Sequence, residues 1–393
     1  MILFYIFAIL LIIQSLISLK QGFSYLSYFQ KFSYKKDFTP RVAIIAPCKG
    51  LDVLMAQYFK SLFEQDYPNY QITFVVESSL DPALVEINKW QALYPQIKTN
   101  YVIAGTSDKC GQKVHNLKAA INSLDENVEA FAFVDSDVCL PKHWLMALIA
   151  PLVDKKIAAT TGYRWFVPTD KRLASLLRSI WNGSIATSLG DHQNNFAWGG
   201  SMAILRSTFY QIDVEKYWQG TVSDDYGLTQ AVKASKLAIK FVPSCLVASL
   251  GGCSFSELLE FTTRQIIITK VYSKPLWWLL FISNSMFNIV FFIGVILGIA
   301  LLVRDFNLLP LLLVFIIYFL GIWKSILRIK AIKLVLTDYE ESISQNLLSY
   351  YFFSPLVALI FGYNLVMSLG RNQITWRGIT YKLISNNETI VIR

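Results

Sequence analysis

Long runs without a charged residue flank the more polar middle of this chain. They cover residues 2–19, 276–303 and 308–323. A backbone in hydrocarbon must pair its polar groups internally, so uncharged runs of this kind are typical of membrane-spanning helices. The sequence therefore predicts an N-terminal transmembrane helix within residues 1–24 and a transmembrane hairpin at 276–323.

The composition agrees with a membrane protein. The chain is 54% hydrophobic and 16% charged, with a mean hydropathy of +0.42, which is too apolar for an ordinary soluble protein. The net charge of +9 fits anionic lipid headgroups and a phosphate-bearing substrate. Nucleic acid is not expected as a partner, because there is no zinc-finger spacing and no basic recognition helix. Five cysteines without a CxxC pair indicate reduced thiols rather than a disulfide framework or zinc site.

Basic residues follow the first apolar run, at Lys20, Lys31, Lys35, Lys36 and Arg41. The positive-inside rule then places the N-terminus outside and the next domain on the cytoplasmic side. No basic segment precedes the run and no small-residue cleavage site follows it, which favours a retained helix over a signal peptide. We expect a multi-pass integral membrane protein.

The C-terminal part is expected to stay at the bilayer. Residues 254–274 read as an amphipathic interface helix, and residues 275–393 as a membrane region with the hairpin, a third apolar segment at 347–369 and a basic tail. Three residues interrupt the third segment: Pro355, Gly362 and Asn364. A spanning segment would leave the basic tail outside, whereas a re-entrant or kinked one would not. The sequence leaves this choice open.

Residues 38–253 have the pattern of an α/β domain. Short β-rich runs alternate with helical patterns, the former at 42–46, 72–76 and 130–134 and the latter at 51–63 and 116–124. This alternation predicts a mostly parallel, doubly wound sheet with helices on both faces.

The run at 130–134 ends in two acids, Asp135 and Asp137, one residue apart. The carboxyl end of a buried strand is where an open α/β sheet places its ligand crevice. Carboxylate oxygens suit a hard divalent cation, which commonly carries phosphates in turn. An ordinary turn of Asp and Ser residues is the alternative reading.

Other polar residues also lie at the predicted ends of strands or helices. Glu77 and Asp81 follow the run at 72–76 and could accept hydrogen bonds from a nucleotide, or could belong to a solvated loop. Lys113 lies just before a predicted helix, where it is placed to pair with a diphosphate. His115 reads as structural or solvent-facing, because no second metal ligand stands at a suitable spacing.

The segment Ser223-Asp224-Asp225 precedes another helical pattern. Ser223 or Asp224 can cap that helix, but one cap needs one carboxylate at most. A second acid near a cation–diphosphate site could stay ionised and accept a proton from an attacking hydroxyl.

Taken together, these residues resemble the membrane-bound family 2 glycosyltransferases, most closely the ceramide glucosyltransferase group. The resemblance runs through Pro47-Cys48-Lys49-Gly50-Leu51-Asp52, Gln65-Asp66-Tyr67-Pro68, Asp81-Pro82-Ala83, Lys113-Val114-His115-Asn116-Leu117, Asp135-Ser136-Asp137, Gly199-Gly200-Ser201-Met202, Asp224-Asp225-Tyr226 and Trp376-Arg377-Gly378-Ile379-Thr380-Tyr381. Their order and spacing, over nearly the whole chain, carry the resemblance more than any one motif.

The resemblance implies a GT-A-type nucleotide-sugar-binding domain, with a mixed, mostly parallel sheet. Asp137 would hold Mg²⁺ or Mn²⁺ on the diphosphate, and Asp225, next to Asp224, would be the general base. The donor would be bound by Pro47, Glu77, Asp81, Lys113 and Asp135. The acceptor or diphosphate side would include Gly200, Arg264, Gln265 and Trp376.

The chain departs from this family in one motif. The family's Gln/Arg-x-x-Arg-Trp sequence aligns with Arg264-Gln265-Ile266-Ile267-Ile268, so that Ile267 and Ile268 stand in place of Arg and Trp. Lys270 could substitute as a point charge, although not as a bidentate fork. Reduced activity or an altered acceptor is the consequence to expect.

The resulting hypothesis is an inverting glycosyltransferase that moves one hexose, glucose first, from a UDP-linked sugar to the hydroxyl of a membrane lipid such as ceramide. Two alternatives stay open: a processive polysaccharide synthase of the hyaluronan or chitin type, and a catalytically silent, membrane-anchored binding protein with the same fold. An ion or solute carrier is not expected, because the later apolar segments contain almost no ionisable residues.

Overall fold

The computed structural model describes residues 1–51 and 54–392 of the 393-residue chain, which forms two compact units. The helical unit comprises Met1–Lys31, Pro168–Thr187 and Gly251–Asn372. The sheet unit comprises Phe32–Val167, Ser188–Leu250 and Gln373–Arg393. We describe each unit by itself.

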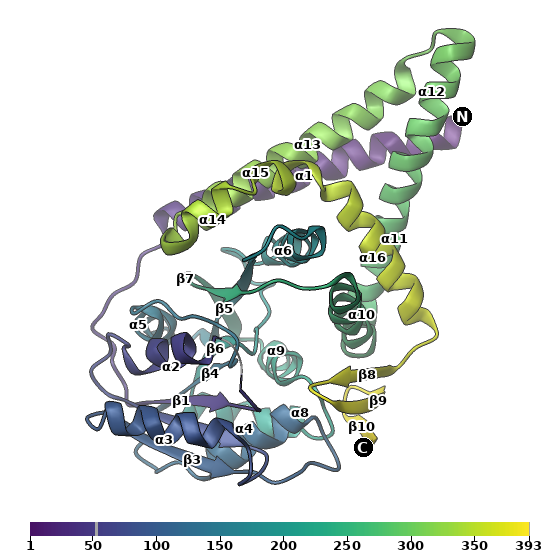
Figure 1. The fold of residues 1–393 in the computed structure, drawn as a ribbon. Coiled ribbons are helices and arrows are strands. Elements are labelled where there is room, and N and C mark those ends of the chain that lie inside the picture. The colour runs from purple at the N-terminus through teal and green to yellow at the C-terminus, as the bar shows by residue number, and fades with distance from the viewer. Residues whose placement is uncertain (52–53, 393) are drawn as a thin grey trace. The chain divides into compact units, whose positions relative to one another are not determined.

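A seven-stranded sheet in the order β3-β2-β1-β4-β6-β5-β7 organises the sheet unit (Figure 1). Its strands are β1 (Val42–Pro47), β2 (Tyr70–Val76), β3 (Lys98–Ile103), β4 (Ala130–Val134), β5 (Ile157–Val167), β6 (Ser201–Leu205) and β7 (Ala238–Leu250). β1 pairs in parallel with β2 and β4, β2 with β3, and β5 with β7, whereas β6 is antiparallel to both β4 and β5. The predicted mixed, mostly parallel sheet is confirmed.

Both faces of the sheet are covered, because alternate residues of β1 and β4 enter two separate apolar clusters. Ile44 and Ala132 pack with helices α2 (Met55–Phe63), α3 (Ala83–Leu93) and α5 (Trp144–Ile149). Ile45 and Phe133 pack with α4 (Gln112–Asn122), α7 (Arg206–Gln211), α8 (Val214–Tyr217) and α9 (Asp224–Ala234). A strand buried on both faces reads as a continuous apolar run, which is why 130–134 stands out in the sequence.

The predicted helices at 51–63 and 116–124 shift at their N-terminal ends. α2 begins at Met55, and residues 52–53 of the expected helix lie outside the described residues. α4 begins at Gln112 with Gly111 as its N-cap. Lys113 therefore lies in the first turn of the helix and not before it, as the sequence had suggested.

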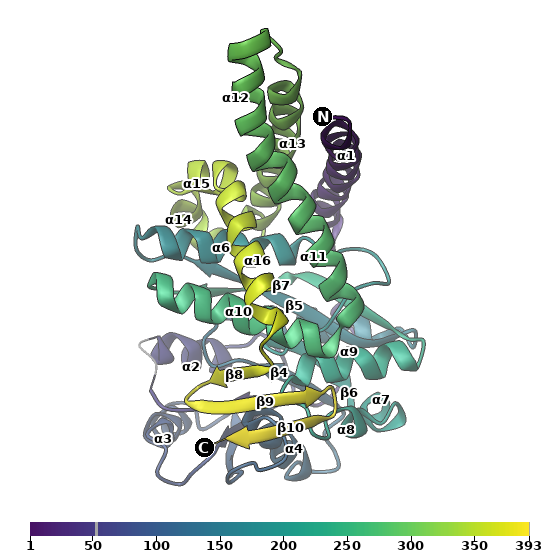
Figure 2. The same cartoon turned by 90° about the vertical axis from the view of Figure 1, so that its right-hand side faces the viewer.

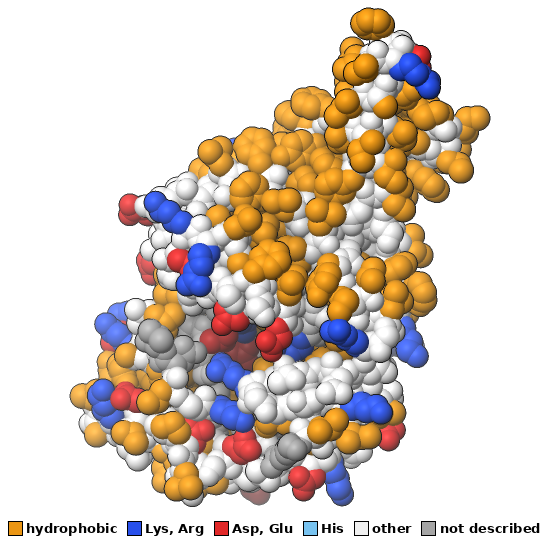
Figure 3. All heavy atoms as spheres, turned by 45° about the vertical axis from the view of Figure 1, so that its right-hand side comes forward, with side chains coloured by type: hydrophobic (Ala, Val, Ile, Leu, Met, Phe, Trp, Pro, Cys, Tyr) orange, Lys and Arg blue, Asp and Glu red, His pale blue; other side chains and the backbone are white. Residues whose placement is uncertain are grey.

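Three helices of the helical unit are long and apolar enough to cross a membrane. They are α1 (Ile2–Lys31), the continuous helix Lys274–Asp305 and α13 (Leu309–Lys333). The second consists of α11 (Lys274–Asn288), a π-helical turn (Ile289–Ile293) and α12 (Gly294–Asp305). Hydrophobic side chains gather over these helices (Figure 3). The N-terminal helix and the helical hairpin predicted from the sequence are both present.

The third apolar segment is broken into α15 (Leu347–Phe352) and α16 (Ser354–Leu369), with Pro355 near the start of α16. Proline suits the first turn of a helix but cannot continue one, so the break falls where the sequence places this residue. α16 has 16 residues and is not one of the three candidate spans. Its buried Asn364 accepts hydrogen bonds from Thr262 (3.2 Å) and Thr263 (2.9 Å).

These two threonines lie on α10 (Phe255–Tyr272), the predicted amphipathic segment, which begins with a capping box of Ser254 and Glu257. The remaining short helices are two 3₁₀ turns, Ala150–Val153 and Thr337–Tyr339, and α14 (Glu340–Ser344).

One segment of the expected 38–253 domain belongs to the helical unit instead. It contains α6 (Leu173–Ala186), which packs on helices of that unit. The Trp181 ring stacks on Phe361 with centroids 4.9 Å apart, and the hydroxyls of Ser179 and Tyr350 lie 2.9 Å apart. Buried side chains on α6 thus join it to helices that come much later in the chain.

The C-terminal tail also differs from the expected organisation, which assigned it to the membrane region. It forms a three-stranded antiparallel sheet of β8 (Gln373–Trp376), β9 (Ile379–Ser385) and β10 (Glu388–Ile392) within the sheet unit (Figure 2). Tyr381 Oη accepts a hydrogen bond of 3.2 Å from the backbone N–H of Gln112. At Gly220, a Cβ would lie 1.9 Å from the Asn387 carbonyl oxygen. The backbone of the tail therefore lies directly against the backbone at Gly220, within the same unit.

The β8–β9 turn is a two-residue loop, Arg377-Gly378, with φ of 51° and 80°. Positive φ at both positions defines a type I′ turn, whose twist matches antiparallel strands. A side chain is disfavoured there, and Arg377 is accordingly an unusual residue for the first position.

Replacing Gly378 by alanine is expected to loosen the tail sheet. No atom lies within 4 Å of a Cβ at this position, so the cost is conformational, about 1 kcal/mol. Amide hydrogen exchange of residues 373–392 in the full-length protein should become about fivefold faster.

The matched control is Gly370→Ala, which also has open space around it but a φ of −95°. In this variant, amide hydrogen exchange of residues 373–392 should be as slow as in the unaltered protein. Equal exchange in both variants would contradict the turn assignment.

Candidate active site

Antiparallel pairing of β4 with β6 brings two glycines to the acidic end of β4. Val134 pairs with Ser201, so the preceding residues Gly199 and Gly200 lie beside Asp135. A Cβ on Gly200 would lie 2.7 Å from Asp135 Oδ2, and one on Gly199 would lie 2.3 Å from Asp224 Oδ2. Glycine is therefore required at both positions for the carboxylates to come this close.

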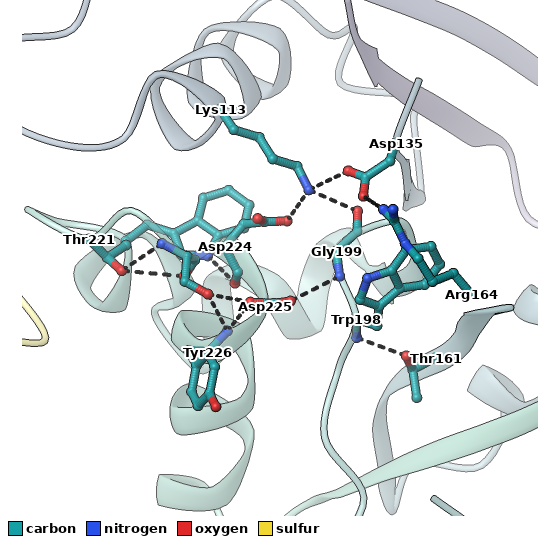
Figure 4. A network of polar contacts seen from close by, with 12 residues as sticks. Lys113, Asp135, Thr161, Arg164, Trp198, Gly199, Thr221, Asp224, Asp225 and Tyr226 are labelled. Atoms are coloured by element: carbon teal, nitrogen blue, oxygen red, sulfur yellow. Dashed lines mark hydrogen bonds and ion pairs between the residues drawn. The ribbon is translucent and has the colours of Figure 1, made fainter. Parts of the chain in front are cut away.

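Lys113 joins three segments in the interior of this site (Figure 4). Its Nζ lies 2.7 Å from Asp135 Oδ1, 3.1 Å from Asp224 Oδ2 and 3.2 Å from the Gly199 carbonyl oxygen. Burial alone would lower the pKa of Lys113, but the two carboxylates outweigh it and raise that pKa above its ordinary value. The predicted Lys113–Asp135 association is present.

Arg164 on β5 is a central residue that the sequence analysis missed. Its Nη2 lies 2.8 Å from Asp135 Oδ2, and its Nη1 lies 3.0 Å from Asp137 Oδ2. The guanidinium also lies over the Trp198 ring, 4.8 Å from its centroid (Figure 4). Burial would raise the pKa of Asp135, yet Lys113 and Arg164 together hold it below its ordinary value.

A glycine in the middle of β5 was the available signal for Arg164. The β5–β7 register shifts between Thr161 and Tyr163, and a Cβ on Gly162 would lie 1.9 Å from the Cys245 carbonyl oxygen. Glycine inside a strand often marks a bulge or close backbone approach, and bulges next to active sites redirect side chains. Arg164 lies two residues beyond this irregularity.

The two acids at the start of α9 have different surroundings. Ser223 is the N-cap, with its Oγ 3.4 Å from the Tyr226 N–H, so the expected cap is confirmed at this residue. Asp224 is buried and pairs with Lys113. Asp225 is half-buried: its Oδ1 accepts hydrogen bonds from Ser223 Oγ and from Tyr226 N (2.8 Å).

The second oxygen of Asp225 is held less tightly. Oδ2 accepts a long hydrogen bond of 3.4 Å from the Gly199 N–H. The carboxylate is thus oriented through Oδ1, while Oδ2 retains capacity to accept a proton or another hydrogen bond.

In the predicted donor-side loops after β1 and β2, Glu77 and Asp81 contact neighbouring groups of these loops. Pro47 ends β1, and Glu77, directly after β2, pairs with Lys49 at 3.1 Å. Asp81 Oδ1 accepts hydrogen bonds of 2.9 Å from both Gly50 N and Ala83 N. These contacts fix the loops after β1 and β2, and a role in nucleotide binding stays a prediction.

The expected acceptor-side residues divide between the two units. Trp376 ends β8 in the sheet unit and is half-buried. Arg264 and Gln265 lie on α10 in the helical unit, where Arg264 is 3.8 Å from Glu260. Gly200 thus lies against Asp135 in the sheet unit. Arg264 and Gln265 belong to the helical unit.

Lys270, suggested as a point charge for the altered motif, contacts backbone carbonyl oxygens of the helical unit. Its Nζ donates hydrogen bonds to the carbonyl oxygens of Ser368, Leu369 (3.4 Å) and Arg371 (2.9 Å). An ammonium group is a favourable partner for carbonyls left unpaired at a helix C-terminus, here that of α16. A role as a point charge for the altered motif stays a prediction.

The carboxylates at the end of β4 fit a divalent cation in type and charge. Asp135, Asp137, Asp224 and Asp225 stand against Lys113 and Arg164 in the described part of this network. No group of three or more His, Cys, Asp or Glu residues in the described chain could hold a metal by itself. Mg²⁺ commonly takes one or two carboxylates and completes its shell with substrate phosphates and water. Asp135 and Asp137 are the residues that would hold such an ion.

The sequence model of glycosyl transferase family 21 matches residues 3–389, nearly the entire chain. The chain belongs to glycosyltransferase family 21. This confirms the resemblance to membrane-bound family 2 glycosyltransferases of the ceramide glucosyltransferase group and the GT-A-type fold.

Two individual comparisons accompany the family 21 assignment. A ceramide glucosyltransferase from Komagataella phaffii is 33% identical over 124 residues, which are 27% of this chain and 24% of that protein. The match thus spans about a quarter of the relative's length. The mannosyltransferase PcManGT from Pyrobaculum calidifontis, solved with GDP-Man and Mn²⁺, has a TM-score of 0.51 at 14% identity, covering 93% of this chain and 99% of that one. This likeness shows a common fold.

The stability of this family 21 protein is expected to depend on the ionisation of Asp224. Burial, the largest effect, raises the pKa of Asp224 to about 6 against the opposing charge of Lys113. This pKa is higher in the folded than in the unfolded chain. The protonated Asp224 carboxyl therefore contributes fully to the unfolding free energy below about pH 4, and this contribution is lost as the pH rises through 6. Asp224→Asn should remove this loss.

Thermal unfolding of Asp224→Asn and the unaltered protein between pH 4.5 and 7.5 tests the prediction. Between these two pH values the unfolding free energy of Asp224→Asn should rise relative to that of the unaltered protein by about 2 kcal/mol. Exposed Asp108→Asn is the control and should show no such trend. A trend of the opposite sign would contradict the pKa shift of Asp224.

Proposed function

We propose that this family 21 glycosyltransferase moves a single hexose, glucose first, from a UDP-linked donor to the hydroxyl of a membrane lipid such as ceramide, with inversion. The observation that carries the proposal is the geometry of Asp225. Its carboxylate is oriented beside a buried cluster of acids and cations by Ser223, Tyr226 N and Gly199 N. A base next to a charged donor site is the arrangement that direct displacement at a sugar carbon requires.

The donor would bind at the carboxyl ends of β1, β2 and β4, where parallel α/β sheets place their ligands. Pro47 ends β1, Glu77 and Asp81 follow β2, and Asp135 directly follows β4. Lys113, held between Asp135 and Asp224, adds a fixed positive charge. A divalent cation on Asp135 and Asp137 would offset the charge that develops on the departing diphosphate.

The reaction would use Asp225 Oδ2 as the proton acceptor. As the acceptor hydroxyl attacks the anomeric carbon, its proton passes to Oδ2 and the bond to the nucleoside diphosphate breaks on the opposite side. Hydrogen bonds to Oδ1 keep the carboxylate from rotating away. Fixed orientation of a catalytic group lowers the entropic cost of the step.

A membrane lipid is the proposed acceptor because the chain combines this site with apolar helices. Three helices qualify as membrane spans, and α10 carries polar and apolar residues along its length. The ceramide glucosyltransferase relative supports a lipid of that class. The cytoplasmic orientation of the sheet unit is part of the same proposal and follows from the basic residues after α1.

Transfer is tested with purified full-length protein, Mn²⁺, labelled UDP-glucose or other nucleotide sugars, and a panel containing ceramide, diacylglycerol and a hopanoid. We expect label in a lipid that carries one hexose. Asp225→Asn should lower the rate at least about a hundredfold while donor binding persists. Asp154→Asn, an exposed residue before β5, should retain full activity.

Three outcomes would overturn the proposal in different ways. Label in an extended water-soluble polymer would indicate a polysaccharide synthase. A lipid product formed equally well by Asp225→Asn would remove that residue as the base. Neither product nor donor hydrolysis with any pair would indicate a silent binding protein.

A further inference from the structure

Arg164 occupies the carboxylate pair that a divalent cation would use. Its two terminal nitrogens contact three carboxylate oxygens: Asp135 Oδ2 at 2.8 Å, Asp137 Oδ2 at 3.0 Å and Asp137 Oδ1 at 3.3 Å. The remaining oxygen, Asp135 Oδ1, is bound by Lys113 at 2.7 Å. All four oxygens of the pair are therefore engaged by cations of the protein itself.

Burial and packing restrict the Arg164 side chain to one position. Its side chain is only 11% exposed. Its guanidinium lies over two aromatic rings, 4.8 Å from the Trp198 centroid and 5.3 Å from that of Phe166. Such cation–π contacts strengthen when the cation is removed from water. The guanidinium thus has a defined place even without a nucleotide.

The charge balance shows why this arrangement suits the state without donor. The side chains of Asp135 and Asp137 are 20% and 33% exposed, and two partly buried carboxylates side by side repel each other unless a cation lies between them. Arg164 supplies this cation. A nucleoside diphosphate, however, adds further negative charge, and the network already has four carboxylates against Lys113 and Arg164.

We propose that Arg164 and a divalent cation compete for the carboxylate oxygens of Asp135 and Asp137, and that the guanidinium released by the cation binds the donor diphosphate. The second half rests on the proposed function, whereas the competition does not. A planar guanidinium matches phosphate oxygens with two parallel hydrogen bonds, as it does a carboxylate. The exchange would let one side chain neutralise the acids first and the diphosphate afterwards.

The exchange also bears on the altered Arg264–Ile268 segment. Ile267 stands where the resemblance places an arginine for the leaving diphosphate. Arg164 is a guanidinium already located in the sheet unit, next to the acids that would hold the cation. It would be a positioning and charge-stabilising residue for the donor.

Competition makes opposite predictions for metal and nucleotide binding. Mn²⁺ binding to the full-length protein without nucleotide is measured by the electron paramagnetic resonance of free Mn²⁺. Arg164→Gln should bind Mn²⁺ at least tenfold more tightly than the unaltered protein, because no guanidinium has to be displaced from Asp135 and Asp137. At saturating Mn²⁺, the same variant should bind UDP at least tenfold more weakly.

Arg164→Lys provides a second variant for the case that Arg164→Gln does not fold. It keeps the charge but cannot bridge both carboxylates, so its Mn²⁺ affinity should lie between the other two. Asp137→Asn should lose Mn²⁺ binding in either background. Mn²⁺ affinity that is unchanged or weaker in both Arg164 variants would overturn the competition.

Failure of this inference is distinguishable from failure of the proposed function. If the Arg164 variants bind Mn²⁺ more tightly but the unaltered protein transfers no sugar, the competition is supported and the proposed reaction is rejected. Tighter Mn²⁺ binding with unchanged UDP affinity would overturn the second half of the inference. If the unaltered protein transfers sugar to a lipid and the Arg164 variants bind Mn²⁺ as it does, the proposed reaction is supported and the competition is rejected.

Discussion

The constraint on which this site depends is the need to neutralise carboxylates at the end of a fully buried strand. Every residue of β4 is buried, so Asp135 follows directly from the core. Carboxylates in such a position require cations or strong hydrogen-bond donors. Lys113 from α4 and Arg164 from β5 provide them, which links a helix on one face of the sheet and a nearby strand to the end of β4.

The antiparallel strand β6 makes this convergence sterically feasible. Its pairing with β4 places Gly199 and Gly200 against the acids, where any side chain would collide with Asp224 or Asp135. The same loop provides the backbone N–H that contacts Asp225 and the indole on which Arg164 lies. One short segment therefore contacts Asp135, Asp224 and Asp225 together. The Gly-Gly pair thus shapes this acidic cluster although it carries no functional group.

Asp224 and Asp225, neighbours at the start of α9, have different surroundings. Asp224 points into the network and is bound to Lys113, while Asp225 is turned toward the Gly199 N–H with one oxygen lightly used. The cap is contributed by Ser223, so neither acid is needed for it. Sequence reasoning identified the pair and the cap, but could not assign which acid lies inside, because that depends on the position of Lys113, more than a hundred residues earlier in the chain.

By itself, the sequence determined the elements whose signals are local. Uncharged runs indicated the membrane helices, the buried run at 130–134 indicated the central strand, and the order of motifs indicated the family. Only the tertiary structure decided which residues meet. Arg164 reaches Asp135 through strand order and a register shift in β5, the tail sheet returns to the sheet unit, and Lys270 caps α16. The physical reason is that periodicity reports the environment of a segment, whereas contacts between distant segments depend on strand pairing, register and charge neutralisation, which no local pattern encodes.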